Sequence, residues 1–336
     1  MKSMSTVSRH ARKVDSAPTI PHISVVIPTY KRPLDIRRCL ESLAHVRYPH
    51  WDVMVVDQSD NNQTQTIVEI FREAIPHLTY QRLSDKGVAR ARNYGLQAAP
   101  GDIIAFLDDD CTVATDWLPQ IAAVFNRYPQ AALVFGALDA APHNHQDYYI
   151  PVYRTRRERI ARGLRGFLHT EGVGASMYVR RAAVSFVGLF DVCLGPGSSL
   201  FVYGGEEVDY LYRCFLHGLT AVYTPHIAVE HHGAREYKSG AVEHIFRGYA
   251  FSGAGADMKL LRCGHPVALV LIASHSLYCL TRINIRNVLS RRGPINYQWI
   301  TMYVRGLHAS FQLSVDRTAC VYVPETDDCN KGNTGR

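Results

Sequence analysis

The chain has 336 residues, of which 47% are hydrophobic and 20% charged, enough for one large or two modest buried cores. No run of about 20 uninterrupted apolar residues occurs, which disfavours a conventional membrane span. The net charge of +7 suits phosphorylated substrates, an anionic membrane surface or nucleic acid. Nucleic acid is not an expected partner, because the sequence has neither zinc-finger spacing nor an aromatic-interleaved RNA-binding motif.

The first 21 residues are polar and basic and lack the apolar segment of a secretory signal, so we expect a disordered leader over 1–21. Eight cysteines are scattered along the chain without a Cys-x-x-Cys pair. This pattern favours a reduced, cytoplasmic protein over a disulfide framework and argues against a zinc site built on cysteine.

Short apolar runs alternate with helical periodicity over the first 140 residues. Strands are expected at 23–27, 53–56, 77–83, 103–107 and 131–138. Helices are expected from Pro33 onward and over 67–74, 86–98 and 117–125. This alternation predicts an α/β fold in which helices cover both faces of a parallel sheet.

Acidic side chains follow two of these strands. Asp57 ends the second strand, and the fourth runs into Asp108, Asp109 and Asp110. Ligands of such sheets bind beyond the carboxyl ends of the strands. Three adjacent carboxylates repel one another, and Mg²⁺ or Mn²⁺ would neutralise them, with Asp108 and Asp110 pointing the same way in extended backbone. The alternative is a solvated acidic turn, and Asp57 alone could equally cap the next loop.

Several short motifs occur in a fixed order along the chain. They lie at 24–32, 55–57, 87–95, 106–110, 172–181, 188–191, 194–197 and 205–213. Together they resemble the family 2 glycosyltransferases, which are inverting, nucleotide-sugar-dependent enzymes of the GT-A fold. The likeness covers about residues 22–250 and implies a Rossmann-like central sheet with helices on both faces.

The resemblance implies a role for each matching residue. The nucleotide-sugar site would comprise Pro28, Thr29, Tyr30, Arg32, Asp57, Arg90, Arg92, Asp108 and Asp109. The metal, Mn²⁺ or Mg²⁺, would be held by Asp108, Asp110 and His231. Trp117 and Glu206 would lie on the acceptor side, although core packing explains Trp117 equally well.

The resemblance also implies a general base. The family carries a Glu-Asp pair whose second acid accepts the proton, and here that position is Glu207, with Asp209 as the nearest rival. The alternative is that these acids only cap the following helix with negative charge at its N-terminus.

The sequence changes character after the segment that resembles the family. We expect the transferase domain over 22–255, a helical extension over 256–323 and a disordered tail over 324–336. The apolar stretch 266–280 is too short to span a bilayer, so a buried helix is the default. The other interpretation is an in-plane membrane helix flanked by arginines, with peripheral association at the inner face of the membrane.

The function expected from these features is transfer of a sugar from a nucleotide diphosphate to an acceptor hydroxyl with inversion. A UDP-sugar is the expected donor. The acceptor would be a glycan or a lipid-linked molecule in glycan, glycolipid or polysaccharide biosynthesis. The alternative is a degenerate relative that binds sugar nucleotides or glycans without turnover. A nucleotidyltransferase or a dinucleotide-dependent dehydrogenase is disfavoured, because the first strand is followed by no glycine-rich phosphate loop.

Overall fold

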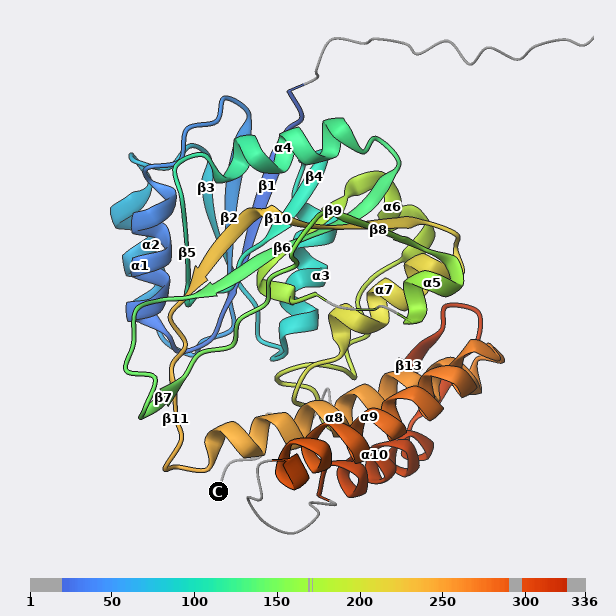
Figure 1. The fold of residues 1–336 in the computed structure, drawn as a ribbon. Helices are drawn as coiled ribbons and strands as arrows, with labels where there is room; N and C mark the ends of the chain where they lie inside the picture. Colours follow the sequence, from blue (N-terminus) through green and yellow to red (C-terminus); the bar gives the residue numbers. More distant parts are fainter. Residues whose placement is uncertain (1–19, 169, 171, 290–297, 325–336) are drawn as a thin grey trace, which may run out of the picture.

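A computed structural model describes residues 20–168, 170, 172–289 and 298–324. A mixed sheet of nine strands forms its centre, in the order β3-β2-β1-β4-β9-β6-β10-β5, with β8 paired to β10 (Figure 1). Its strands are β1 (Ile23–Thr29), β2 (Trp51–Asp57), β3 (Leu78–Arg82), β4 (Ile103–Phe106), β5 (Cys111–Val113), β6 (Ala131–Ala140), β8 (Arg159–Arg162), β9 (Met177–Arg180) and β10 (Thr220–His231).

The four neighbouring strands β3, β2, β1 and β4 are parallel to one another, as the sequence predicts. Strands β1 and β2 are buried along their whole length, which is why they read as continuous apolar runs. The sequence did not predict β9, which lies antiparallel between β4 and β6. The sheet is therefore mostly, not wholly, parallel.

Helices cover both faces of the sheet and enclose two separate apolar cores. On one face lie α1 (Pro33–Leu43), α2 (Gln63–Phe71) and α4 (Trp117–Arg127). On the other lie α3 (Val88–Ala98), α5 (Gly163–Leu168), α6 (Arg181–Val187) and α7 (Glu206–Leu216). The short 3₁₀ helix η1 (Gly174–Ser176) precedes β9. The predicted α/β class, with helices on both faces, is confirmed.

The C-terminal part forms a helical layer below the sheet in Figure 1. It comprises α8 (Ala241–Arg262), α9 (Val267–Leu289), α10 (Gln298–Ala309), η2 (Ser310–Gln312) and a hairpin of β12 (Ser314–Asp316) and β13 (Val321–Val323). A small pair, β7 (Tyr148–Tyr149) with β11 (Arg235–Glu236), lies at the entry to α8. Within the described ranges, no helix is both long enough and apolar enough to cross a bilayer.

The expected boundary between residues 255 and 256 falls inside α8, which is continuous from Ala241. Glycines on this helix allow close packing. A Cβ at Gly255 would lie 2.5 Å from the Phe201 ring, and one at Gly248 would lie 2.1 Å from the Tyr203 ring. The helical layer therefore begins at Ala241. The leader falls outside the described residues except for Ile20 and Pro21, and the tail does so except for Pro324.

A buried ionic network joins this layer to the transferase domain. The Lys259 Nζ of α8 lies 2.5 Å from Asp191 Oδ2 and 2.6 Å from Asp209 Oδ1 of α7. Arg213 Nε donates to the other oxygen of Asp209, at 3.0 Å. The backbone N–H of Tyr322, in β13, donates to Asp191 Oδ2 at 2.7 Å. Two carboxylates and two cations thus balance one another at the contact between α7, α8 and the hairpin.

A second buried carboxylate, Asp257, fixes the helices of the layer to one another. It accepts hydrogen bonds from the hydroxyls of Tyr212 on α7 and Tyr303 on α10, at 3.1 and 2.6 Å. His275 Nδ1, on α9, lies 2.6 Å from the same carboxylate. The inner face of α9 is therefore held in place by a polar contact as well as by packing. None of the seven cysteines that the structure describes forms a disulfide.

Candidate active site

The site lies at the carboxyl edge of the sheet, where β1 and β4 end and α7 begins (Figure 1). The three consecutive aspartates there have different partners. Asp109, 5% exposed, accepts from Thr29 Oγ1 at 2.7 Å and from Arg32 Nη1 at 3.1 Å. Arg32 also donates to Asp110 Oδ2 at 2.7 Å. Thr29, Arg32, Asp109 and Asp110 are thus brought together as the sequence predicts.

The electrostatics differ along the triplet. Burial and the negative charge of Asp110 raise the pKa of Asp108, although the Arg92 guanidinium opposes this. Burial raises the pKa of Asp109 to about 7 against the charge of Arg32. Burial would also raise the pKa of Asp110. The hydrogen bond and charge of His231, together with Arg32, outweigh this and lower the pKa of Asp110 below its usual range. Asp110 is therefore the carboxylate best kept ionised.

A metal-binding geometry exists around Asp110. One ligand atom from each of Asp110, Cys111 and His231 lies within 4.8 Å of the others, and His231 Nε2 is 3.2 Å from Asp110 Oδ1. A Cβ at Gly233 would lie 2.6 Å from Asp110 Oδ2 and 2.8 Å from His231 Nε2, so only glycine leaves this space open. Carboxylate and imidazole suit Mn²⁺, whereas thiols suit softer ions. The residues present therefore fit a hard divalent cation on Asp110 and His231.

Asp108 is outside this compact group, so the predicted set of three ligands is only partly brought together. Its Oδ1 accepts from Arg92 Nη2 at 3.2 Å, and its side chain remains 36% exposed. Asp108 faces the open side of the site.

Arg92, predicted to lie in the donor site, is paired with two carboxylates. It is 3% exposed, and its Nη1 donates to Glu206 Oε1 at 2.7 Å while Nη2 contacts Asp108. A Cβ at Gly174 would lie 2.4 Å from Nη2, so this glycine makes room for the guanidinium. Arg92 therefore links the aspartate triplet to the start of α7. No local signal identifies this role, because Glu206 is 114 residues away.

Glu206 and Glu207 occupy the first turn of α7, which follows Gly205 at φ 97°. Glu206 is 4% exposed and bonded to Arg92, so it does not face an acceptor as predicted. Glu207 is half-buried, and its Oε2 has no hydrogen-bond partner among the described residues. Burial and the charge of Glu206 raise the pKa of Glu207 to about 8, although Arg92 opposes this. Once it is ionised, at pH values around 8 and above, Glu207 can accept a proton.

Asp209 lacks those properties. Both of its carboxylate oxygens are occupied, one by Arg213 and the other by Lys259, and the residue is 2% exposed. The rival base is therefore a structural member of the ionic network, not an acceptor of protons from a substrate.

Asp57 and Trp117 are also buried. Asp57 is fully buried, and its oxygens accept from the Ser59 N–H and the Tyr80 hydroxyl, both at 2.8 Å. It caps its loop, which was the alternative to donor binding. Trp117 is 1% exposed, and its Nε1 donates to Tyr178 Oη at 3.0 Å. Core packing, not an acceptor pocket, explains Trp117.

The remaining predicted donor residues differ in exposure. Pro28 is buried within β1, which extends beyond the predicted end, whereas Tyr30 is 40% exposed. The ammonium groups of Lys86 and Lys31 lie 5.2 and 5.5 Å from the Tyr30 ring centroid. Arg90 is half-buried and makes no ion pair within the part of the chain that the structure describes. Neither lysine is among the predicted donor residues, although Lys31 lies within the motif 24–32 and Lys86 directly precedes the motif 87–95.

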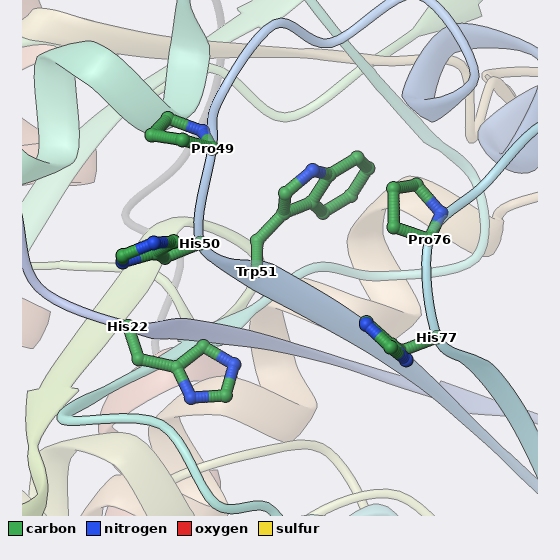
Figure 2. Close-up of a pocket in the computed structure, with 6 residues that line it drawn as sticks. All are labelled: His22, Pro49, His50, Trp51, Pro76 and His77. Atoms are coloured by element: carbon green, nitrogen blue, oxygen red, sulfur yellow. The ribbon is translucent and has the colours of Figure 1, made fainter.

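A cavity of about 330 Å³ lies at the opposite edge of the sheet, at the amino-terminal ends of the strands (Figure 2). It is lined by His22, Pro49, His50, Trp51, Pro76 and His77. The three imidazoles lie apart around the Trp51 ring in Figure 2, and His22 Nε2 is paired to Asp52 at 2.8 Å. Because the acids and the α7 N-terminus lie at the carboxyl edge, this cavity is not the candidate active site.

Solved structures with the same arrangement are glycosyltransferases. The first 349 residues of S. aureus TarS align with a TM-score of 0.54 and 18% identity, over 85% of this chain and 81% of that one. The mannosyltransferase PcManGT of Pyrobaculum calidifontis aligns with a TM-score of 0.55 and 17% identity, over 89% of each chain. The fold is that of a GT-A glycosyltransferase.

Sequence comparisons define the family. Residues 24–185 match the model of glycosyl transferase family 2. The glycosyltransferase AglE of Haloferax volcanii is 35% identical over 30% of this chain and 34% of its own length. The succinoglycan biosynthesis protein ExoM of Rhizobium meliloti is 30% identical over 61% of this chain and 64% of its own. The chain spans less than two thirds of either relative. Residues 24–185 therefore form a segment of glycosyl transferase family 2.

Proposed function

We propose that this glycosyltransferase moves a sugar from a UDP-sugar to an acceptor hydroxyl with inversion, and that Glu207 is the general base. The observation that supports this most strongly is the Glu207 carboxylate, whose Oε2 has no partner among the described residues and whose pKa is raised to about 8. At pH values around 8 and above, where this carboxyl is ionised, it can take the acceptor proton. A single displacement of the nucleotide diphosphate by the acceptor hydroxyl, assisted by one base, inverts the configuration of the anomeric carbon.

The chain's own residues position this reaction. Arg92 holds Glu206 and Asp108 in fixed directions, so the start of α7 and the triplet keep a constant separation. Asp110 and His231 would hold Mn²⁺ or Mg²⁺, and Asp108 would face the donor. When bound, the cation supplies positive charge that stabilises a diphosphate leaving group. The exposed Tyr30 ring, with Lys31 and Lys86 beside it, would support the nucleotide base.

The nucleotide and the cation draw support from the structural relatives. TarS was solved with UDP and with UDP-GlcNAc, and PcManGT with GDP-Man and Mn²⁺. We propose UDP because of TarS, and GDP is the alternative to be compared in binding. ExoM, named for succinoglycan biosynthesis, supports a role in polysaccharide formation. The acceptor proposed is a glycan or lipid-linked molecule, used at the inner face of the membrane.

Nucleotide binding should depend on the cation. UDP at about a hundred times its dissociation constant should stabilise the fold by about 2.7 kcal/mol with Mn²⁺ present and much less in EDTA, because Asp108 and Asp110 repel an unaccompanied diphosphate. Thermal unfolding followed with UDP, GDP and each cation measures this. Asp110→Asn should lose the effect, whereas Asp116→Asn, outside the site, should keep it. Equal stabilisation in EDTA would contradict the metal-bridged site.

The transfer rate should depend on pH through Glu207. Below a pKa of about 8 the carboxyl is increasingly protonated and cannot accept a proton. At pH values well below that pKa, kcat/KM should fall about tenfold per pH unit, and it should level off above it. Rates from pH 6 to 9 with Mg²⁺, and donor affinity by calorimetry at each pH, separate catalysis from binding. A flat profile would remove the support for Glu207.

A transfer assay also separates the enzyme from a degenerate binding protein. If the protein binds a sugar nucleotide but transfers no sugar to any of a panel of glycan and lipid-linked acceptors, the degenerate binding protein is favoured.

A further inference from the structure

Two free thiols of the C-terminal layer lie in direct contact. Cys263 caps the C-terminal end of α8, and Cys320 directly precedes β13. The two side chains are hydrogen-bonded to each other. Cys320 lies in an apolar core, and Cys263 packs against the same core. We call these two residues the thiol pair. Because they touch, they meet the first requirement for a disulfide, which is proximity of the two side chains.

The backbone on both sides of the thiol pair is held by other contacts. Arg262, which adjoins Cys263, donates from Nη1 to the Leu313 carbonyl at 2.8 Å, just before β12. Lys259 lies one turn earlier on α8, and its ammonium is 5.2 Å from the centroid of the Tyr322 ring of β13. The end of α8 is therefore fixed against both strands of the hairpin, and these contacts keep the two thiols together.

The two thiols differ in exposure and in acidity. Cys263 is half-buried, whereas Cys320 is 4% exposed. The hydrogen bond from Cys320 lowers the pKa of Cys263 against the effect of burial, and the positive charges of Lys259 and Arg262 also lower it. The same hydrogen bond, together with burial, raises the pKa of Cys320. Because the thiolate is the nucleophile, Cys263 is the thiol that attacks an oxidant and Cys320 is the thiol that closes the disulfide.

Three other described cysteines lack these properties. Cys39 and Cys111 are fully buried, and burial raises the pKa of both thiols well above the ordinary value. Cys279, on α9 of the same helical layer, is 5% exposed, and burial raises its pKa to about 11. These thiols are protonated at neutral pH and shielded from a reagent in solution, so they serve as internal references for Cys263.

We infer that Cys263 and Cys320 form a reversible dithiol–disulfide pair, oxidised by glutathione disulfide or a similar small disulfide, that fastens the β12–β13 hairpin to α8. The Cys263 thiolate attacks one sulfur of the oxidant, so that a mixed disulfide forms and one glutathione thiolate leaves. The Cys320 sulfur gives up its proton, attacks Cys263 Sγ and releases the second glutathione. Two protein thiols thus lose two electrons and two protons, and one glutathione disulfide becomes two glutathiones.

The disulfide would reinforce a contact that the hairpin already makes. The backbone N–H of Tyr322, two residues after Cys320, donates to Asp191 Oδ2, and this carboxylate also holds Lys259 of α8. A covalent link between Cys263 and Cys320 would hold the hairpin to α8 beside these ionic contacts. In a reducing compartment the pair stays as thiols, and exposure to an oxidant closes it, so the link is a response to oxidant and not a permanent cross-link.

The experiment treats the folded full chain with glutathione disulfide at about pH 8, blocks the remaining thiols under denaturing conditions, and maps the cysteine peptides by mass spectrometry. A Cys263–Cys320 disulfide should form at least about tenfold faster than any modification of Cys279, and dithiothreitol should reverse it. The oxidised chain should also unfold at a higher temperature than the reduced chain, because the disulfide restricts the unfolded segment between the two cysteines.

Serine variants separate the two roles. Cys320→Ser should stop at a mixed disulfide of Cys263 with glutathione, because the attacking thiol remains and the closing thiol is missing. Cys263→Ser should leave Cys320 reduced, because that thiol is buried. The matched control is Cys279→Ala, which removes a buried thiol of the same layer and should oxidise like wild type. A cooperative unfolding transition of each reduced variant shows that it is folded.

Any of three results would overturn the inference. Both thiols of the pair could stay reduced in wild type under glutathione disulfide. A mixed disulfide that persists on wild-type Cys263 would show that Cys320 does not close the bond. A disulfide from either thiol to Cys329, which lies outside the described residues, would show that the partner is another cysteine.

Discussion

Replacing Glu207 with glutamine should lower the transfer rate by roughly 10²–10⁴-fold while leaving donor affinity nearly unchanged, the range expected for a general base. Glutamine keeps the size of the side chain but cannot accept a proton. The partnerless Oε2 position becomes an amide or carbonyl group, so no existing hydrogen bond of the described structure is broken. The aspartate triplet and Arg92 are untouched, which is why binding of donor and metal should persist.

Calorimetry with UDP-sugar and Mn²⁺ measures the affinity, and transfer to the true acceptor measures the rate. Donor hydrolysis is a weaker assay, because water need not use the acceptor's base. The control Glu243→Gln changes an acid of α8 whose side chain is 78% exposed and should retain full activity. Wild-type transfer by Glu207→Gln would exclude this residue as the base. Because Asp209 is bonded through both oxygens, loss of activity in Asp209→Asn should come with loss of stability.

Glu206→Gln should behave differently from Glu207→Gln. It weakens the charged contact with Arg92, which also holds Asp108, so donor affinity as well as rate should respond. A loss of transfer rate alone therefore indicates a role in proton transfer. A loss of both transfer rate and donor affinity indicates a role in positioning.

The sequence predicts the fold well where periodicity is local. The buried runs of β1, β2, β4 and β6 and the helices between them follow from residue patterns alone. The antiparallel β9 does not, because its four residues carry no mark of strand direction. The continuity of α8 was missed for another reason. The close contacts of its Gly255 and Gly248 with Phe201 and Tyr203 join residues far apart in the chain, so no local pattern reports them.

The site was predictable to the level of motifs but not of partners. Asp110 and His231 lie close together, and Glu207 lies in the first turn of α7. Asp57, Arg92 and Trp117 also belong to recognisable segments, yet each is buried against a residue that the chain brings from elsewhere. For Arg92 and Glu206 the separation is 114 positions, which no local pattern can report. Burial is a tertiary property, and it decides whether a polar residue contacts the ligand or supports the residues that do.

The same reasoning gives the largest effect expected on stability, at Lys259. This side chain is fully buried, with Nζ 2.5 Å from Asp191 and 2.6 Å from Asp209. Lys259→Ala removes one cation and leaves two buried carboxylates with only Arg213 as a charged partner. Removing one partner of a buried ion pair typically costs about 3–5 kcal/mol, so the free energy of unfolding should fall by about that amount.

Denaturant unfolding of the full chain measures this loss, with two controls. Lys238→Ala removes an exposed lysine and should stay within about 0.5 kcal/mol of wild type. Lys259→Met keeps most of the buried volume but not the charge. If it is as unstable as Lys259→Ala, the ionic contacts account for the effect; if it regains most of the stability, packing does. Unfolding of Lys259→Ala at the wild-type midpoint would show that α8 and α7 are held together without this network.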